Sequence, residues 1–211
     1  PPSCALRAPF ALLLSGTQCL PGQFCAGSSS PEPSGDCDAG YYCTGGAEDS
    51  IGRNGGGETP IGHYTPKGSA QPIPCPLGKF NRQKRQGECT ECTKGYYCPE
   101  RGMTDNKWCT PGHFCPPGSV LPTRCPTGTF STLDRLRNYT ECTPCTPGKY
   151  CGTTGLQAPT SDCAAGYFCE LGAASSKPPL LAFKWQNVVG GGVCPKGHYC
   201  PTGTAIPITC P

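Results

Sequence analysis

The apolar positions of this chain fall in a short pattern that recurs along its length: a cysteine, two variable residues, a glycine, another variable residue, an aromatic residue and a second cysteine. The glycine allows the positive φ angle that a tight loop needs, and the aromatic ring supplies a large apolar face beside a disulfide. The pattern predicts short two-stranded ribbons, turns and irregular loops, with little or no helix. Seven segments follow it: CLPGQFC (19–25), CDAGYYC (37–43), CTKGYYC (92–98), CTPGHFC (109–115), CTPGKYC (145–151), CAAGYFC (163–169) and CPKGHYC (194–200).

Cysteine replaces the usual hydrophobic core as the main source of stability. The 211 residues include 20 Cys, 30 Gly and 26 Pro, and Leu, Ile, Val and Phe are scarce. Gly and Pro disfavour long helices and central strands, and so small a repeated unit cannot bury a core of its own. Disulfides must hold the units together, and they persist only in an oxidising compartment. We therefore expect a small disulfide-rich fold, an elongated tandem array of short β-ribbon and loop modules, in a secreted or cell-surface protein.

Two further segments, CPLGKF (75–80) and CPTGTF (125–130), keep the first cysteine, the glycine and the aromatic residue but lack the second cysteine. Each is followed by a polar loop and a Cys-x-x-Cys. They predict four parts: a long cysteine-rich cycle at 1–74, a short cycle at 75–124, a long cycle at 125–209 and the start of another cycle at 210–211.

The first and last cycles can be aligned residue by residue. Residues 55–76 match residues 190–211 without gaps, and Thr59 and Thr65 stand where the last cycle has Cys194 and Cys200. Both cysteines are absent together, so cysteines come and go as complete segments. We interpret the chain as an internal, N-terminally truncated part of a longer protein.

Two disulfide pairings are compatible with these segments. In one, each segment closes on itself and two longer loops close through Cys75–Cys89 and Cys125–Cys142; in the other, neighbouring segments pair crosswise. Sequence spacing cannot decide between them, but loss of cysteines as complete segments favours self-closure. Cys4 and Cys210 are left without an assigned partner. The cysteines expected in disulfides are Cys19, Cys25, Cys37, Cys43, Cys75, Cys89, Cys92, Cys98, Cys109, Cys115, Cys125, Cys142, Cys145, Cys151, Cys163, Cys169, Cys194 and Cys200.

The repeated segments resemble the cysteine-rich repeats named for their Gly-Cys-Cys pattern, which are related to ephrin-receptor-like repeats. This resemblance covers essentially the whole chain. More distantly, 75–92 and 125–145 are similar to tumour-necrosis-factor-receptor modules. Long arrays of such repeats occur in large secreted or surface proteins, including the mastigoneme proteins that form hair-like filaments on flagella. The resemblance implies an architecture more strongly than a function.

Asn138-Tyr139-Thr140 is an acceptor sequence for N-linked glycan in a polar loop. In a secreted chain this sequence predicts glycosylation of Asn138; the alternative is an unused sequon.

The stretch 179–189 contains the richest apolar run, in a connector whose counterpart at 44–58 is polar and rich in Gly. A thin, stapled array has little interior to receive Leu181, Phe183 and Trp185. We expect these side chains to dock on a neighbouring module or on another chain, with packing inside the molecule as the alternative.

Other kinds of site find little support in the sequence. The Cys-x-x-Cys pairs belong to separate bridges in an oxidised array, and His63, His113 and His198 recur once per cycle, so we expect no metal site and no cofactor. The basic loop Lys79, Arg82, Lys84 and Arg85 is expected to be a solvated face rather than a site for acidic glycans. No catalytic constellation stands out. A net charge of +3 gives no reason to expect nucleic acid, and no apolar run is long enough to insert into a membrane.

These observations predict a non-catalytic structural or assembly module of a large extracellular filament or surface coat. Its partners would be other copies or other subunits of the assembly, and glycans would be attached covalently. A mastigoneme-like appendage on a flagellar or ciliary surface is the sharpest form of this expectation. The alternative is the rod-like ectodomain of a cell-surface receptor or adhesion protein.

Overall fold

The structure is a computed structural model that describes residues 19–27, 32–179 and 190–211. The chain forms two compact units. The first comprises the described residues of Pro1–Ile73 together with Gln83–Glu88, and the second comprises those of Pro74–Arg82 and Cys89–Pro211.

The described chain contains very short strands and one short helix. The 3-10 helix is η1 (Tyr139–Glu141). The strands are β1 (Gln23–Phe24), β2 (Gly35–Asp36), β3 (Tyr41–Cys43), β4 (Gly56–Glu58), β5 (His63–Tyr64), β6 (Ile73–Pro74), β7 (Lys79–Phe80), β8 (Thr90–Glu91), β9 (Tyr96–Tyr97), β10 (Lys107–Trp108), β11 (His113–Phe114), β12 (Thr123–Arg124), β13 (Thr129–Phe130), β14 (Thr143–Pro144), β15 (Lys149–Tyr150), β16 (Ser161–Asp162), β17 (Tyr167–Phe168), β18 (Gly192–Val193), β19 (His198–Tyr199) and β20 (Ile208–Thr209).

The seven-residue segment is the building block of the fold, and we call each copy a repeat, with positions one to seven. Position four is always Gly and position six is always aromatic; the residues that follow position seven form the tail of the repeat. In chain order, repeats 1 to 10 are 19–25, 37–43, 59–65, 75–81, 92–98, 109–115, 125–131, 145–151, 163–169 and 194–200.

The strands form two-stranded sheets, and each sheet links one repeat to the next. Positions five and six of a repeat pair with the two residues that precede the following repeat. In repeat 5, for example, Tyr96 lies opposite Trp108 and Tyr97 opposite Lys107, in antiparallel register. Because each ribbon is only two or three residues long, it has too little surface to be stable alone.

Consecutive repeats of the same unit are joined by one recurring set of four backbone hydrogen bonds. The N–H at position four donates to the carbonyl at position seven of the next repeat, and the carbonyl at position four accepts from the next position one. The carbonyl at position one accepts from the N–H of a residue in the tail of the next repeat. The N–H at position seven donates to the carbonyl of the residue that directly follows that tail residue. For repeats 5 and 6 these bonds are Gly95 N to Cys115 O (2.8 Å), Cys109 N to Gly95 O (3.0 Å), Gly118 N to Cys92 O (2.8 Å) and Cys98 N to Ser119 O (2.9 Å).

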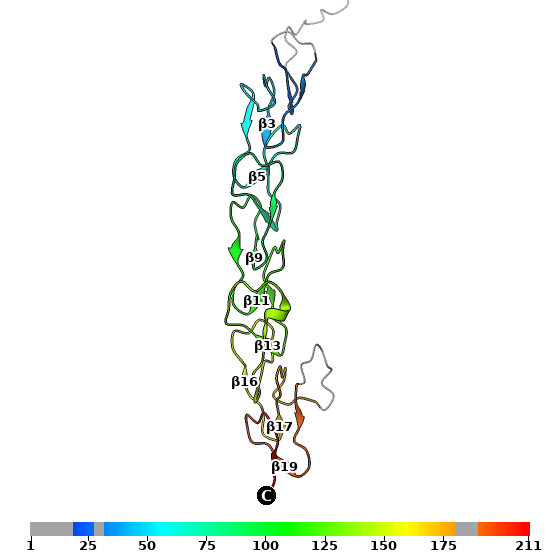
Figure 1. Cartoon of the computed structure of the whole chain (residues 1–211), viewed down its shortest axis with the longest axis vertical. Helices are drawn as coiled ribbons and strands as arrows, with labels where there is room; N and C mark the ends of the chain where they lie inside the picture. The colour runs from blue at the N-terminus through cyan, green and yellow to red at the C-terminus, as the bar shows by residue number, and fades with distance from the viewer. Residues whose placement is uncertain (1–18, 28–31, 180–189) are drawn as a thin grey trace, which may run out of the picture. The chain divides into compact units, whose positions relative to one another are not determined.

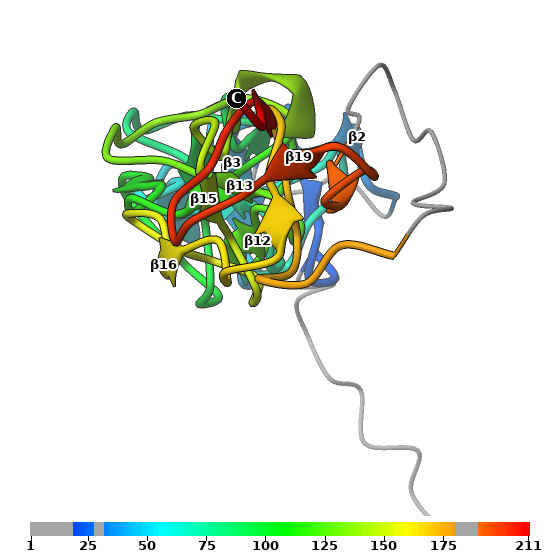
Figure 2. The same cartoon turned by 90° about the horizontal axis from the view of Figure 1, so that it is seen from below.

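We call this set of bonds the backbone ladder. It explains how a chain with so few regular elements satisfies its buried backbone groups, since each repeat supplies the partners that its predecessor lacks. Figure 1 shows β9, β11, β13, β17 and β19 of the second unit following one another in chain order. In the view turned by 90°, β13 and β15 lie close together in projection, with β19 beside them (Figure 2).

The buried apolar residues of the described chain are mostly cysteines; the others are Ala47, Phe80, Leu136 and Ala173. They gather in small clusters, each belonging to one contact between neighbouring repeats. The expected fold class, small disulfide-rich β-ribbon modules in tandem with almost no helix, is therefore confirmed for the described residues.

Candidate functional site

In the described residues nine disulfides staple the repeats, and each complete cysteine segment closes on itself. The bridges are Cys19–Cys25, Cys37–Cys43, Cys75–Cys89, Cys92–Cys98, Cys109–Cys115, Cys125–Cys142, Cys145–Cys151, Cys163–Cys169 and Cys194–Cys200. This is the pairing that the sequence favoured, and not the crosswise alternative. Cys210 is a free, exposed thiol, and its N–H donates to Gly197 O at 2.9 Å, as position one of a repeat does. Cys4 lies outside the described residues. The disulfides indicate a secreted or otherwise extracellular protein.

The aromatic residue at position six packs against the disulfide of the following repeat. Phe80 of repeat 4 lies against Cys92 and Cys98 of repeat 5, with Met103 beside them. Phe24, Phe114 and Tyr150 make the equivalent contact in their own clusters. The sequence predicted an aromatic face beside a disulfide; the structure adds that the ring crosses to the next repeat. Ring and bridge therefore reinforce the same contact that the backbone ladder makes.

Buried polar residues occupy the repeat positions from which cysteine is missing. Asn81 and Ser131 stand at position seven of repeats 4 and 7, and are 2% and 1% exposed. The Asn81 Oδ1 accepts a hydrogen bond from Thr90 N at 3.3 Å, and its Nδ2 donates to Cys89 Sγ at 3.7 Å. The Ser131 Oγ accepts from Leu133 N at 3.1 Å. In these two repeats the second cysteine of the bridge lies further along the chain, at Cys89 and Cys142, and a polar side chain stands at position seven instead.

Repeat 3 has neither cysteine. Thr59 and Thr65 are both fully buried, and their hydroxyl groups hydrogen-bond to each other where a disulfide would lie. The sequence analysis noted the substitution, but not that the two side chains would form this pair.

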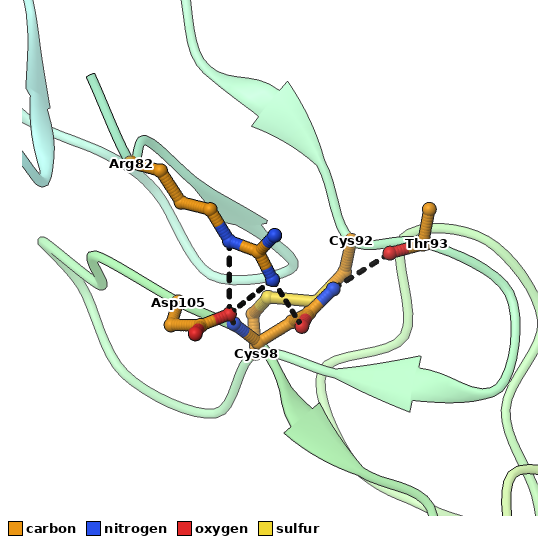
Figure 3. Close-up of polar contacts among 6 residues, drawn as sticks. Arg82, Cys92, Thr93, Cys98 and Asp105 are labelled. Atoms are coloured by element: carbon orange, nitrogen blue, oxygen red, sulfur yellow. Dashed lines mark hydrogen bonds and ion pairs between the residues drawn. A yellow bond between two sulfur atoms is a disulfide. The ribbon is translucent and has the colours of Figure 1, made fainter.

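The loop closed by Cys75–Cys89 carries the basic residues noted in the sequence, and two of its arginines form ion pairs. In Figure 3, Arg82 points at Asp105 near the Cys92–Cys98 disulfide; its Nε donates to Asp105 Oδ1 at 3.1 Å. The same guanidinium donates to Asn106 Oδ1 at 3.2 Å, and Asn106 Nδ2 donates to Thr93 Oγ1 at 2.6 Å. The hydrogen bonds from Arg82 and from the Asn106 N–H hold the pKa of Asp105 below its ordinary value.

Within the first unit, Arg85 forms an ion pair with Glu58. The hydrogen bond from Arg85 lowers the pKa of Glu58, and the same bond raises the pKa of Arg85. The guanidinium also lies 5.9 Å from the centre of the Tyr41 ring, within reach of a cation–π contact. The acidic partners were missed by sequence reasoning because Asp105 lies 23 residues from Arg82 in the sequence and Glu58 lies 27 residues from Arg85.

Three histidines occupy position five of repeats 3, 6 and 10. Each has its Nδ1 next to the backbone carbonyl two residues earlier: His63 at 3.1 Å, His113 at 3.0 Å and His198 at 3.2 Å. The same local contact recurs each time, so these histidines belong to the repeat. Among the residues that the structure describes, no three metal-ligating side chains lie together.

The predicted glycosylation site, Asn138, lies on the surface in the loop closed by Cys125–Cys142. It caps η1: its Oδ1 accepts hydrogen bonds from Thr140 N, at 2.9 Å, and from the Thr140 hydroxyl. Next to it, the Tyr139 ring packs edge-on against Phe114, with ring centres 6.5 Å apart. The predicted interface residues Leu181, Phe183 and Trp185 lie outside the described residues.

None of the helices in the described part of the chain has the length and apolar character needed to cross a membrane. No protein-family model matches this chain, and a search of curated proteins finds no match.

Proposed function

We propose that this chain is a non-catalytic structural module of a large extracellular filament or surface coat, in which it contacts other copies or other subunits. The observation that carries the proposal is the backbone ladder. Within each unit, a repeat presents to the next the same donors and acceptors that it takes from the one before, so the fold grows by repetition. Such a stack supplies stiffness and length without needing a reactive site.

The use of buried space supports this proposal. Among the described residues, most of the buried side chains are disulfide cysteines or the polar residues that stand in their place. Charged side chains lie at the surface in pairs such as Lys149–Asp162 and Lys107–Glu100, both about half exposed or more. Such pairs contribute little to stability but keep the surface of the stack soluble.

Glycan attachment at Asn138 is part of the proposal. An N-linked sugar is attached to Nδ2, whereas both hydrogen bonds of the Asn138 side chain described above use Oδ1. The cap on η1 can therefore persist beneath the sugar. A glycan there would shield one face of the repeat stack from proteases.

The resemblance to mastigoneme proteins makes a flagellar or ciliary appendage the most specific form of the proposal. Electron microscopy of the full-length protein, released from its native surface without reductant, tests it. Regular fibres in which this protein recurs along the axis would support an assembly subunit. Separate molecules, each ending in a membrane anchor, would overturn it in favour of a receptor or adhesion ectodomain.

A further inference from the structure

Repeat 3 is the one described repeat in which no disulfide holds position one. Its neighbours in sequence are closed by Cys37–Cys43 on one side and Cys75–Cys89 on the other, and no cysteine lies between Cys43 and Cys75. In place of a bridge it has the hydrogen-bonded, fully buried pair Thr59 and Thr65. The rest of the repeat keeps its usual sequence features, with Gly62 at position four and Tyr64 at position six.

The backbone of repeat 3 is built like that of the stapled repeats. Thr59 N donates to Gly40 O and Gly40 N donates to Thr65 O, both at 2.9 Å. In repeat 6 the equivalent bonds are Cys109 N to Gly95 O and Gly95 N to Cys115 O, at 3.0 and 2.8 Å. The two repeats thus make the same backbone contacts in the folded state. They differ in what closes them, the Thr59–Thr65 pair or a disulfide, and therefore in how much freedom they gain on opening.

That difference is set by the unfolded segment. A disulfide restricts the opened loop to closed conformations, whereas two threonines release it completely. The hydroxyl–hydroxyl bond adds only a modest net stabilisation, because water offers equivalent partners once the repeat has opened. Repeat 3 should therefore open more often than its stapled neighbours. Proteolysis of a folded protein follows such local openings when closing is faster than cleavage.

We propose that repeat 3 is a built-in proteolytic processing site, where an extracellular endoprotease cuts the folded and fully oxidised chain. The bonds after Tyr64 and Lys67 suit proteases that recognise aromatic or basic residues, and Lys67 lies exposed in the tail. Cutting there would leave no covalent link between the residues that precede residue 65 or 68 and the stapled repeats that follow, because no described disulfide spans the cut. The inference depends on the stapling pattern and not on the proposed assembly role.

Two equivalent peptide bonds provide a matched test. Chymotrypsin cleaves after aromatic residues, and Tyr64 and Phe114 both stand at position six, in repeats 3 and 6. The oxidised protein is treated with chymotrypsin, samples are then reduced, and mass spectrometry follows each cleavage with time. We expect cleavage after Tyr64 to be roughly tenfold faster or more than cleavage after Phe114, given the entropy that a bridge of this loop length removes.

A pair of reciprocal variants separates stapling from local sequence. Thr59→Cys/Thr65→Cys should form a bridge, checked by thiol titration, and should slow cleavage after Tyr64 to the rate seen in repeat 6. Cys109→Thr/Cys115→Thr should speed cleavage after Phe114 to the rate seen in repeat 3. Equal rates after Tyr64 and Phe114 in the parent protein, or an unchanged rate after Tyr64 once the new bridge has formed, would overturn the proposal.

Hydrogen exchange distinguishes opening from protease access. The amides of Gly40 and Gly95 donate to position seven of repeats 3 and 6 respectively. The Gly40 amide should exchange roughly tenfold faster than that of Gly95 in the parent protein, and the double-cysteine variant should slow it. Equal exchange of the two amides would show that repeat 3 opens no more readily, and the processing site would then have no basis.

Discussion

At the scale of single residues, the glycine at position four is the most constrained part of the repeat. Gly95 has φ +84°, which favours glycine, and a Cβ placed on it would lie 2.6 Å from the carbonyl oxygen of Arg135, in the tail two repeats further on. Gly68 has a similar φ, +77°, but the nearest atom that a Cβ there would meet is Asp36 Cγ at 3.6 Å, an ordinary van der Waals contact. The two positions separate the effect of backbone conformation from the effect of close packing.

Gly95→Ala should therefore destabilise the protein more than Gly68→Ala. Both variants place Ala in the left-handed region, at a cost of about 1–2 kcal/mol, and only the first forces backbone atoms apart, which should add roughly 1–3 kcal/mol. The measurement is hydrogen exchange of the Cys109 amide, which donates to Gly95 O, and of the Cys43 amide, which donates to Ser69 O next to Gly68. Equal losses of protection in the two variants would show that the close approach has no energetic effect.

Arg82 gives a residue-scale prediction about pH. Because the pKa of Asp105 is lowered in the folded state, its contribution to stability is complete above the unfolded pKa and is lost as pH falls through the folded pKa. Arg82→Gln should move the Asp105 titration, followed by NMR, up towards the ordinary value. Glu100, whose pKa is lowered by the hydrogen bond from Lys107, is the internal control and should not move. An unchanged Asp105 midpoint would contradict this account of its pKa.

Asn138 gives a prediction about modification. In a host that adds N-linked glycan, the protein should carry one sugar chain that is lost in Asn138→Gln and kept in Thr140→Ser, which preserves the acceptor sequence. Intact-mass measurement before and after enzymatic deglycosylation shows whether the sugar chain is present in each variant. If the mass of the parent protein did not change on deglycosylation, Asn138 would carry no sugar, and the glycan would not be part of the proposed function.

At the scale of elements, the polar residues at position seven show how a repeat tolerates losing its own bridge. Asn81 fills the place of a cysteine and ties β7 to β8 through Thr90. Asn81→Leu would remove the side-chain acceptor of the Thr90 N–H, and should cost about 0.5–1.5 kcal/mol, the net value of an ordinary hydrogen bond.

Asn81→Ser introduces the residue that repeat 7 has at the same position, and it should lower the free energy of unfolding by less than Asn81→Leu does. Denaturant unfolding with the disulfides intact, together with the exchange rate of the Thr90 amide, compares the two variants. If Asn81→Leu were as stable as the parent, the apolar side chain would serve equally well there and the assigned role of Asn81 would be wrong.

Much of this element-level structure was visible in the sequence, and the limits are physical. Cysteine and glycine at fixed spacing predicted the self-closed loops, because in seven of the nine described bridges the two cysteines are only six residues apart. The partners of Arg82 and Arg85, and the contact of Phe80 with the next disulfide, depend on how repeats stack. Nothing local in the sequence encodes that stacking, so these contacts could not be predicted. The docking role of Leu181, Phe183 and Trp185 stays a prediction.

At the scale of the whole molecule, the protein replaces a hydrophobic core with a series of stapled contacts between neighbours. Stability in such a chain is close to a sum over repeats and their contacts. It should consequently vary along the chain with the stapling of each repeat, and it should depend on oxidation far more than on pH, since disulfides do not titrate.

The central claim is that each stapled repeat closes on itself, so that neighbouring repeats are held against each other by the backbone ladder and not by disulfides. Tryptic mapping of the non-reduced protein tests this most directly, because Lys94, Lys149 and Lys196 lie inside three of the cysteine loops. Cleavage there splits each loop into two peptides. The account predicts that the peptides containing Cys92 and Cys98 remain joined to each other, as do those of Cys145 and Cys151, and of Cys194 and Cys200. A peptide joining Cys92 to Cys109 would contradict it.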